Sequence, residues 1–348
     1  MVVSEHRLIK LACSCGKQCE TVFPPEARAY TSYGPRVRAF ALYLMARQHL
    51  PVERAAQALA DLLGVECSTG FLDNIYNEAK DGLEDFYNEV RRQLIGSDVV
   101  HFDETPMRVG VVRHWVHVCS NNLLTLLHSD STRGKAAVKR AGVLENFRGV
   151  CVSDRLSMYF GYKDSKHQVC NAHLLRDLAS VGEITGQAEW ATQMAELLTK
   201  TNEQAHSARK LGKSRLSFIQ LAQLSLNYDL IVKQGLAQNQ PLLARKRNNL
   251  EKESYNLVQA FLKLKDEITL FAYDLSIPFT NNQAENDLRM VKLQQKISGS
   301  MRSASGLGRF AKVRSYISTC SKQNVNVIDA LCDLFLGKPW MPPVPARI

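Results

Sequence analysis

The sequence lacks several features that would place it in a membrane or an oxidising compartment. It has no run of eighteen apolar residues, and its start, "MVVSEHRLIKLACS", does not have the layout of a signal peptide. Most of its nine cysteines stand singly in apolar segments, which is not the pattern of a disulfide framework. We therefore expect a soluble, cytoplasmic protein with no membrane partner.

Acidic residues are also in short supply. The 348 residues include 34 Asp and Glu against 44 Lys and Arg, which gives a net charge of +10. Such an excess suits a polyanionic partner, because cations that neutralise phosphates release bound counterions. The hydrophobic content of 45% excludes a disordered chain and allows two or three domains.

One cysteine cluster departs from the scattered pattern. The stretch "CSCGKQC" places Cys13, Cys15 and Cys19 close together beside a glycine, as in a zinc knuckle. A structural zinc site needs four ligands, whereas the next cysteine, Cys67, is far along the chain. His6 could complete the set at an irregular spacing, so zinc binding by this segment stays an open interpretation.

Residues 31–96 have a helical pattern. Pro51 stands where a helix would begin, Gly64 can end that helix, and Ser68 can cap the next one. Two short helices joined by a tight turn resemble a helix-turn-helix, which would place residues 68–79 in a DNA major groove. The alternative is an ordinary helical hairpin, since the second helix has few cations.

Residues 97–181 have the pattern of an α/β domain. The segments "DVVHFDE", "HWVHVCS" and "LLTLLHS" predict three strands, and "STRGKAAVKRAG" predicts a helix with a Ser or Thr cap. The segment "GVCVSD" predicts a fourth, buried strand. Because strand–helix–strand crossovers are short and right-handed, we expect this strand to lie parallel to the first.

The remainder of the chain divides into two parts. Residues 182–275 show no strand signal and predict a helical insertion, after which residues 276–348 resume the domain and end in a helix within "NVNVIDALCDLFLG". The segment "GSMRSASGLGRF" predicts a Gly/Ser loop flanked by Arg302 and Arg309, either suited to phosphate contact or simply a turn.

Three acids stand at informative positions. Asp103 and Asp154 follow the first and fourth predicted strands, 51 residues apart, so they would emerge at the same edge of the sheet. Each could instead begin a turn. Glu285 lies three residues after Asn282, where a capping box would place its acid. Convergence of Asp, Asp and Glu would supply the oxygen ligands that Mg²⁺ prefers.

Several long blocks resemble one family. "HFDETPMRV", "FRGVCVSDRLSMYF", "CNAHLLRDL" and "PFTNNQAENDLRMVKLQQKISGSMR" look like the insertion-sequence-66 family of bacterial transposases, as do "YGPRVRAFALYL" and "RSYISTCSKQNVNVIDAL". The resemblance implies an α/β fold with a ribonuclease-H-like catalytic domain interrupted by a helical insertion. A helical DNA-binding-like region and a partial zinc-ribbon segment would precede it. The expected parts are residues 1–30 (partial zinc ribbon), 31–96 (helix-turn-helix-like), 97–181 and 276–348 (catalytic domain), and 182–275 (insertion).

The resemblance also implies roles for particular residues. The triad of the family falls on Asp103, Asp154 and Glu285, which would bind two Mg²⁺ or Mn²⁺ ions. Supporting positions beside the triad fall on Cys170, His173, Asn281 and Asn282; for the Cys-x-x-His pair, metal binding is the alternative to packing. The cations expected to hold DNA phosphates are Arg289, Lys292, Lys296, Arg302 and Arg309.

Two departures from the family pattern stand out. Arg155 and Leu156 occupy positions where many relatives have Gly and a small or aromatic residue. The resemblance also implies a zinc ribbon of which only the second half would be present. Despite these departures, the resemblance implies a DDE-type transposase that cleaves DNA at element ends and joins them to target DNA. The partners would be double-stranded DNA, further copies of the chain assembled on it and helper proteins of the element. The alternatives are a DNA-binding remnant without transposition and a ribonuclease-H-like nuclease.

Overall fold

The computed structural model describes residues 3–23, 32–183, 188–239 and 249–344. The chain divides into two compact units, which are described separately. Unit 1 contains residues 1–90, 107–112 and 292–348, and unit 2 contains residues 91–106 and 113–291. The five-part division expected from the sequence stays a prediction. Within the described ranges, no helix is long and apolar enough to cross a membrane.

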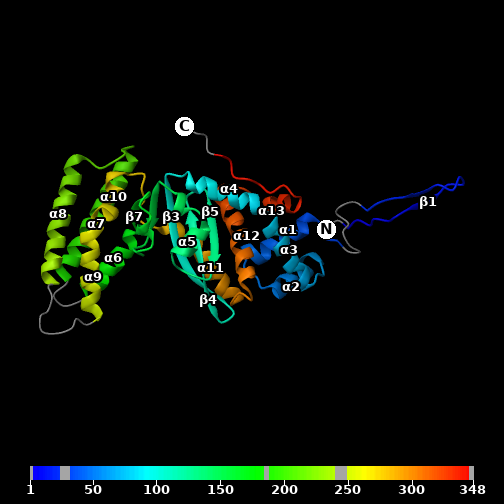
Figure 1. Ribbon diagram of the computed structural model, residues 1–348, viewed down its shortest axis with the longest axis horizontal. Helices are drawn as coiled ribbons and strands as arrows, with labels where there is room; N and C mark the ends of the chain where they lie inside the picture. The colour runs from blue at the N-terminus through cyan, green and yellow to red at the C-terminus, as the bar shows by residue number, and fades with distance from the viewer. Residues whose placement is uncertain (1–2, 24–31, 184–187, 240–248, 345–348) are drawn as a thin grey trace. The chain divides into compact units, whose positions relative to one another are not determined.

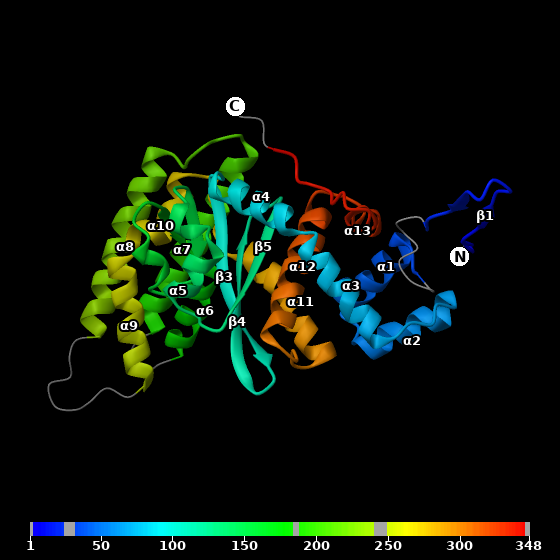
Figure 2. The ribbon, with the colours of Figure 1, turned by 45° about the vertical axis from the view of Figure 1, so that its right-hand side comes forward.

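Unit 2 contains most of a mixed five-stranded sheet with the strand order β5-β4-β3-β6-β7 (Figures 1 and 2). The fourth predicted strand, now β6, pairs with β3 in parallel, so that expectation is confirmed. The sequence pattern missed β7, which continues the parallel part of the sheet. The strands are β3 (Val99–Val109), β4 (Val112–Ser120), β5 (Thr125–Asp130), β6 (Val150–Ser153) and β7 (Lys166–Val169).

The predicted crossover helix, α5 (Lys135–Ala141), connects β5 to β6 together with a short 3-10 turn, η2 (Leu144–Asn146). It ends, as expected, at Gly142 in the left-handed conformation (φ 75°). The expected Ser or Thr cap is wrong. The residue at the cap position is Gly134, which has no side chain that could accept a capping bond. Thr132 lies before it, and its backbone N–H and hydroxyl donate to Asp130 Oδ1.

Beyond β6, the described part of unit 2 is helical except for β7, in agreement with the predicted insertion. The long helices lie side by side as a bundle in both ribbon views (Figures 1 and 2), and their apolar faces enclose Trp190, Tyr228 and Phe261. The elements are η3 (Tyr159–Gly161), α6 (Asn171–Gly182), α7 (Ala188–Lys210), α8 (Phe218–Gln238), α9 (Asn249–Lys263) and α10 (Lys265–Tyr273).

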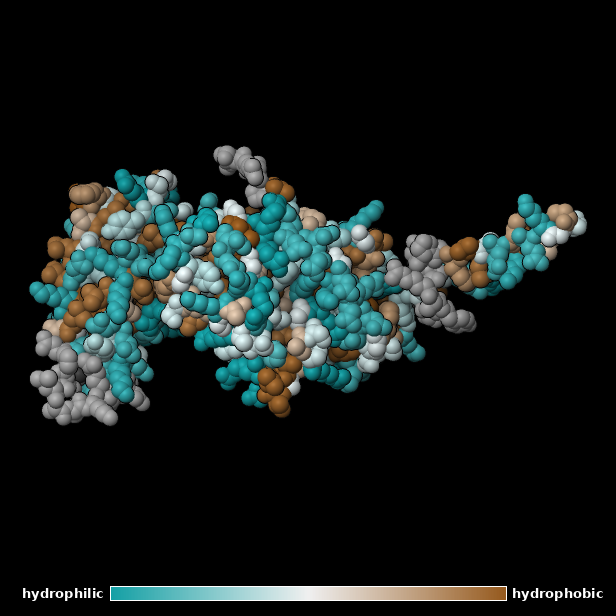
Figure 3. Space-filling model, in the orientation of Figure 1, coloured by the Kyte–Doolittle hydropathy of each residue, from teal (hydrophilic) through white to brown (hydrophobic). Residues whose placement is uncertain are grey.

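Helix α8 is apolar on more than its buried face. Figure 3 shows hydrophobic side chains at the surface of the bundle. Phe218, Ile219, Leu226 and Leu230 are each more than half exposed. A helix of this kind has a wider apolar surface than its own bundle covers.

Unit 1 combines helices from both ends of the chain. The predicted start and stop signals of the 31–96 region are confirmed: Gly64 ends α2 in the left-handed conformation, and Ser68 caps α3 by accepting a bond from Phe71 N–H. The elements are β1 (Lys10–Ala12), β2 (Gln18–Glu20), α1 (Pro35–Leu42) with a π-helical turn η1 (Tyr43–Arg47), α2 (Val52–Leu63), α3 (Thr69–Asp81), α12 (Ala304–Lys322) and α13 (Val327–Phe335). Two further helices, α4 (Glu84–Ile95) and α11 (Asn282–Ser298), have residues in both units.

The expected Gly/Ser loop in "GSMRSASGLGRF" is wrong, because most of this stretch forms the first turns of α12. Ser303 caps the helix by accepting a bond from Gly306 N–H at 3.0 Å. Leu307 and Phe310 are buried, and this burial stabilises the helix despite its two glycines. The glycines therefore do not form a phosphate-binding loop.

Candidate active site at the sheet edge

The register of the sheet aligns the first two acids. Strands β3 and β6 pair Val99 with Val150 and His101 with Val152, so paired residues are 51 apart in the sequence. Asp103 and Asp154 are also 51 apart, and each lies two residues beyond the last of these pairs. Neighbouring strands are about 4.8 Å apart. The two acids therefore occupy one row at the carboxyl edge of the parallel part of the sheet, where β6 ends; β3 itself continues past Asp103 to Val109.

Strand β7 extends the same row by one position. Ser153 pairs with Val169, and Cys170 N–H donates to the Ser153 carbonyl at 2.8 Å. Cys170 is therefore beside Asp154 at the sheet edge and is also the residue that precedes α6. His173 follows in the first turn of that helix.

Asn281 fixes the start of α11 against this edge. Its side-chain N–H donates to the Phe102 carbonyl at 2.9 Å, and its Oδ1 lies 2.8 Å from His101 Nδ1. Its backbone N–H donates to Cys170 Sγ at 3.1 Å. These three bonds connect the helix to β3 and to α6, so the position of Asn281 sets the position of the first turn of α11.

Glu285 projects from that first turn towards α6. Its Oε1 is 3.6 Å from His173 Nδ1 and 3.9 Å from Arg176 Nη2. The expected capping box is not formed, because the helix begins at Asn282 and Glu285 N–H bonds to the carbonyl of Asn281. The side chain is directed at the site instead.

Electrostatics show that the three acids interact. Burial raises the pKa of Asp103 to about 7. A bond from Glu104 N–H at 2.8 Å opposes this rise, whereas the negative charges of Glu104, Asp154 and Glu285 add to it. Because the neighbouring carboxylates repel a negative charge on Asp103, binding of either a proton or a cation at this side chain is favourable.

The loop after Asp154 contains the residues that depart from the family pattern. Leu156 N–H donates to Asp154 Oδ1 at 2.9 Å, which holds the carboxylate in place. Arg155 forms an ion pair with Asp177 of α6. The unusual arginine therefore attaches the loop to the neighbouring helix and leaves Asp154 at the edge.

Glu104 points to the opposite face of β3, as strand alternation requires. It is buried, accepts a bond from Arg133 at 2.7 Å and receives one from the Tyr159 hydroxyl at 2.5 Å. Arg133 also lies over the ring of Trp115, 5.0 Å from its centroid. Sequence reasoning did not separate Glu104 from Asp103, although the alternation was available to do so.

The predicted phosphate-binding cations fall into two groups. Arg289, Lys292 and Lys296 are exposed along α11, and Arg302 is exposed as well. Arg309 is different: it pairs with Asp73 and Asn77 and lies 5.3 Å from the ring centroid of Tyr76. Its guanidinium therefore joins α12 to α3 within unit 1.

The N-terminal cysteines lie on and around the β1–β2 hairpin, where all three are exposed. Hydrogen bonds from Cys15 lower the pKa of Cys13. Among the described residues, the group of three ligand side chains whose donor atoms all lie within 4.8 Å of one another is Cys170, His173 and Glu285. Neither the N-terminal cysteines nor the three acids form such a group.

Comparison with known protein families finds a match over most of the chain. A family model described as "Transposase IS66 family" matches residues 30–309, a range that includes Asp103, Asp154 and Glu285. A comparison with curated proteins finds no match for the chain.

Proposed function

The chain belongs to the IS66 family of transposases, and on this premise we propose that Asp103, Asp154 and Glu285 form a ribonuclease-H-like, metal-dependent site for DNA cleavage and strand transfer. The observation that carries the proposal is the shared row of Asp103 and Asp154, together with the rise in the pKa of Asp103 caused in part by the other two acids.

The donor set fits hard divalent cations. Three carboxylates at one sheet edge offer only oxygen ligands, and Mg²⁺ or Mn²⁺ typically combines a few of these with water and substrate phosphate. When bound, two such ions would activate the attacking oxygen and stabilise the leaving oxygen of a phosphodiester. Cation binding would also displace the proton that Asp103 holds near neutral pH.

The chain's own residues position the site. Leu156 N–H holds the Asp154 carboxylate, and Asn281 anchors the helix that carries Glu285. Arg289, Lys292 and Lys296 are exposed on the same helix as Glu285 and would hold DNA phosphates, so binding would weaken as salt rises. Target and element ends, further copies of the chain and helper proteins are the proposed partners.

The test is a strand-transfer assay on oligonucleotides that carry the element's own termini, with Mg²⁺ or Mn²⁺. Metal-dependent nicking followed by joining to a target duplex supports the proposal. DNA binding without any nicking would indicate a remnant that recognises ends. Nicking that prefers branched DNA over the termini would indicate a nuclease instead.

A further inference from the structure

We propose that Cys170, His173 and Glu285 form a second kind of metal site, one that takes a single thiophilic divalent ion such as Zn²⁺. This site is distinct from the all-oxygen site proposed above and shares only Glu285 with it. The ligand atoms of the three residues all lie within 4.8 Å of one another.

The fold brings the three ligands together from two helices. Cys170 precedes α6 and His173 is the third residue of that helix, and this spacing places both side chains on one face of the first turn. Glu285 approaches from the first turn of α11, which Asn281 connects to Cys170 through its backbone N–H. The site is therefore built on helix ends that other bonds already hold together.

The spacing agrees with zinc coordination. Zn–N bonds of about 2.0–2.1 Å and Zn–O bonds of about 2.0–2.2 Å at tetrahedral angles place two such ligands about 3.3–3.5 Å apart. His173 Nδ1 and Glu285 Oε1 are 3.6 Å apart. Three protein ligands would leave a fourth position for water or substrate, as in open zinc sites.

The same two atoms lack hydrogen-bond partners. His173 Nδ1 and Glu285 Oε1 are shielded from solvent and form no hydrogen bond with the described residues. Most buried polar atoms have a hydrogen-bond partner, so two ligand atoms that face each other at 3.6 Å without a hydrogen bond favour a cation bound to both. Arg176 does not satisfy Glu285, because it is 3.9 Å away and its side chain is 63% exposed.

The thiol supports the choice of metal. Cysteine and histidine ligands favour zinc-class ions over Mg²⁺, which prefers oxygen alone. Asn281 N–H already donates to Cys170 Sγ, and this bond would also stabilise a thiolate. Burial raises the pKa of Cys170, so the free site holds a thiol, and metal binding would form the S–metal bond and release the proton to solvent.

If the function proposed above is correct, zinc binding at this site would also affect catalysis. An ion bound to Cys170 and His173 would engage Glu285, which the oxygen site also needs. Zn²⁺ would then inhibit Mg²⁺-dependent cleavage by competing for one shared carboxylate.

The binding test uses Co²⁺ as a spectroscopic substitute for zinc and the full chain in which Cys13, Cys15 and Cys19 are replaced by Ser. One Co²⁺ per chain with a thiolate-to-cobalt charge-transfer band, displaced by Zn²⁺, is the expected result. Cys170→Ser keeps an acceptor for Asn281 N–H and should lose the band. His173→Gln should weaken binding at least tenfold, whereas His173→Cys, which restores a zinc ligand, should retain it.

The matched control is Cys332→Ser, a partly exposed cysteine of α13 in unit 1, which should leave the band unchanged. Melting curves show whether each variant is folded. A band that persists in Cys170→Ser, or the absence of stoichiometric Co²⁺ binding by a folded chain, would overturn the proposal.

The cleavage arm separates this proposal from the proposed function. Zn²⁺ should inhibit Mg²⁺-dependent nicking by the parent chain, and Cys170→Ser should be at least tenfold less sensitive, each measured against its own rate in Mg²⁺ alone. Co²⁺ binding at Cys170 in a chain that nicks with no metal would contradict the proposed function and leave the zinc-class site standing. Equal Zn²⁺ sensitivity of the two chains would contradict the shared use of Glu285.

Discussion

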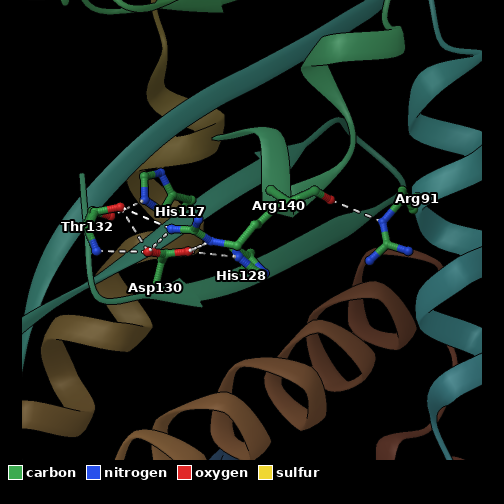
Figure 4. A network of polar contacts seen from close by, with 7 residues as sticks. Arg91, His117, His128, Asp130, Thr132 and Arg140 are labelled. Atoms are coloured by element: carbon green, nitrogen blue, oxygen red, sulfur yellow. Dashed lines mark hydrogen bonds and ion pairs between the residues drawn. The ribbon is translucent and has the colours of Figure 1, made fainter. Parts of the chain in front are cut away.

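Asp130 and Asp103 lie on the same sheet but have opposite surroundings. Asp130 ends β5, where its carboxylate accepts bonds from Arg140 at 2.6 and 2.8 Å and from Thr132 N–H at 2.8 Å (Figure 4). Although burial raises its pKa, these bonds lower the pKa of Asp130 well below the usual range. Two nearby histidines, His117 and His128, have pKa values lowered by burial and are neutral at pH 7.

The carboxylate of Asp103 has no arginine or hydroxyl donor among the residues that the structure describes. It accepts a bond from Glu104 N–H, and its charged neighbours include three other acids. Asp130 therefore carries a charge that the protein already balances, whereas Asp103 carries a charge that only a proton or a bound cation can balance. Residue type alone does not distinguish an aspartate with a structural role from one that could bind a cation. The number of hydrogen-bond donors and positive charges around the carboxylate distinguishes them.

The largest expected effect is the loss of DNA cleavage when Asp103 or Asp154 is replaced. Asp103→Asn and Asp154→Asn should each reduce Mg²⁺-dependent cleavage by several orders of magnitude while DNA binding persists, because a neutral amide is a poor ligand for a hard cation. The control is Asp98→Asn, an exposed position just before the first residue of β3. Near-wild-type cleavage by either of the first two variants would remove that residue from the proposed site.

Glu285→Gln tests whether the third acid is a ligand or has only a structural role near the start of α11. Loss of a charge near a helix N-terminus costs about 0.3–1 kcal/mol, so a structural role predicts little change. Metal ligation predicts a loss of cleavage of orders of magnitude with a similar Tm, partly restored by Mn²⁺. Cleavage and melting are measured on one preparation, and full activity would remove Glu285 from the proposed site.

Stability should respond with opposite signs at Asp130 and Asp103. Asp130→Asn should lower the free energy of unfolding by about 1–3 kcal/mol, because Arg140 and Thr132 lose a charged acceptor. Asp103→Asn should leave it unchanged or raise it in metal-free buffer at pH 8, because a repelled charge is removed. Denaturant unfolding measures both, and two losses of equal size would remove the distinction between the acids.

The pH dependence follows from the raised pKa of Asp103. The folded chain binds this proton up to about pH 7, whereas an unfolded Asp releases it near pH 3.9. The contribution to stability is therefore complete below pH 3.9 and is lost as the pH rises towards 7, by at most about 1.4 kcal/mol per pH unit. Wild type minus Asp103→Asn should show this slope in metal-free buffer. A flat difference between pH 4 and 7 would contradict the raised pKa.

Much of this edge could be predicted from the sequence. The periodicity of "DVVHFDE" and "GVCVSD" and the crossover rule predicted two parallel strands, and the observed pairing confirms them. Asp154 directly follows β6 as expected, but the expectation that Asp103 ends its strand is wrong, because β3 continues past it to Val109. The position of Glu285 depended on the resemblance to the family, because its local pattern favours a cap. Its direction towards α6 could not be predicted, since Asn281 fixes it through contacts with residues more than 100 positions away.

Other features depended on packing that local pattern does not contain. The glycines of "GSMRSASGLGRF" favour a loop, but burial of Leu307 and Phe310 decided for a helix. Arg309 follows a Gly-rich segment, yet its partners Asp73 and Asn77 are more than 230 residues earlier in the sequence. Strand β7 has only four residues, Lys166–Val169, and a segment this short does not show a recognisable alternation of apolar and polar residues.

The smallest expected effect applies the same contrast to two cations. Arg309 has its charge matched by Asp73, as Asp130 has its charge matched by Arg140, whereas Lys292 is exposed and forms no ion pair with the described residues. Lys292→Ala should weaken DNA binding a few-fold and reduce the slope of log Kd against log salt by about 1, since one phosphate contact is lost. Arg309→Ala should leave that slope unchanged and lower the Tm, because α12 loses its contact with α3. Binding titrations at several salt concentrations, with melting curves on the same samples, measure both effects. A salt slope that falls for Arg309→Ala and not for Lys292→Ala would show that matched partners do not separate structural from binding charges in this protein.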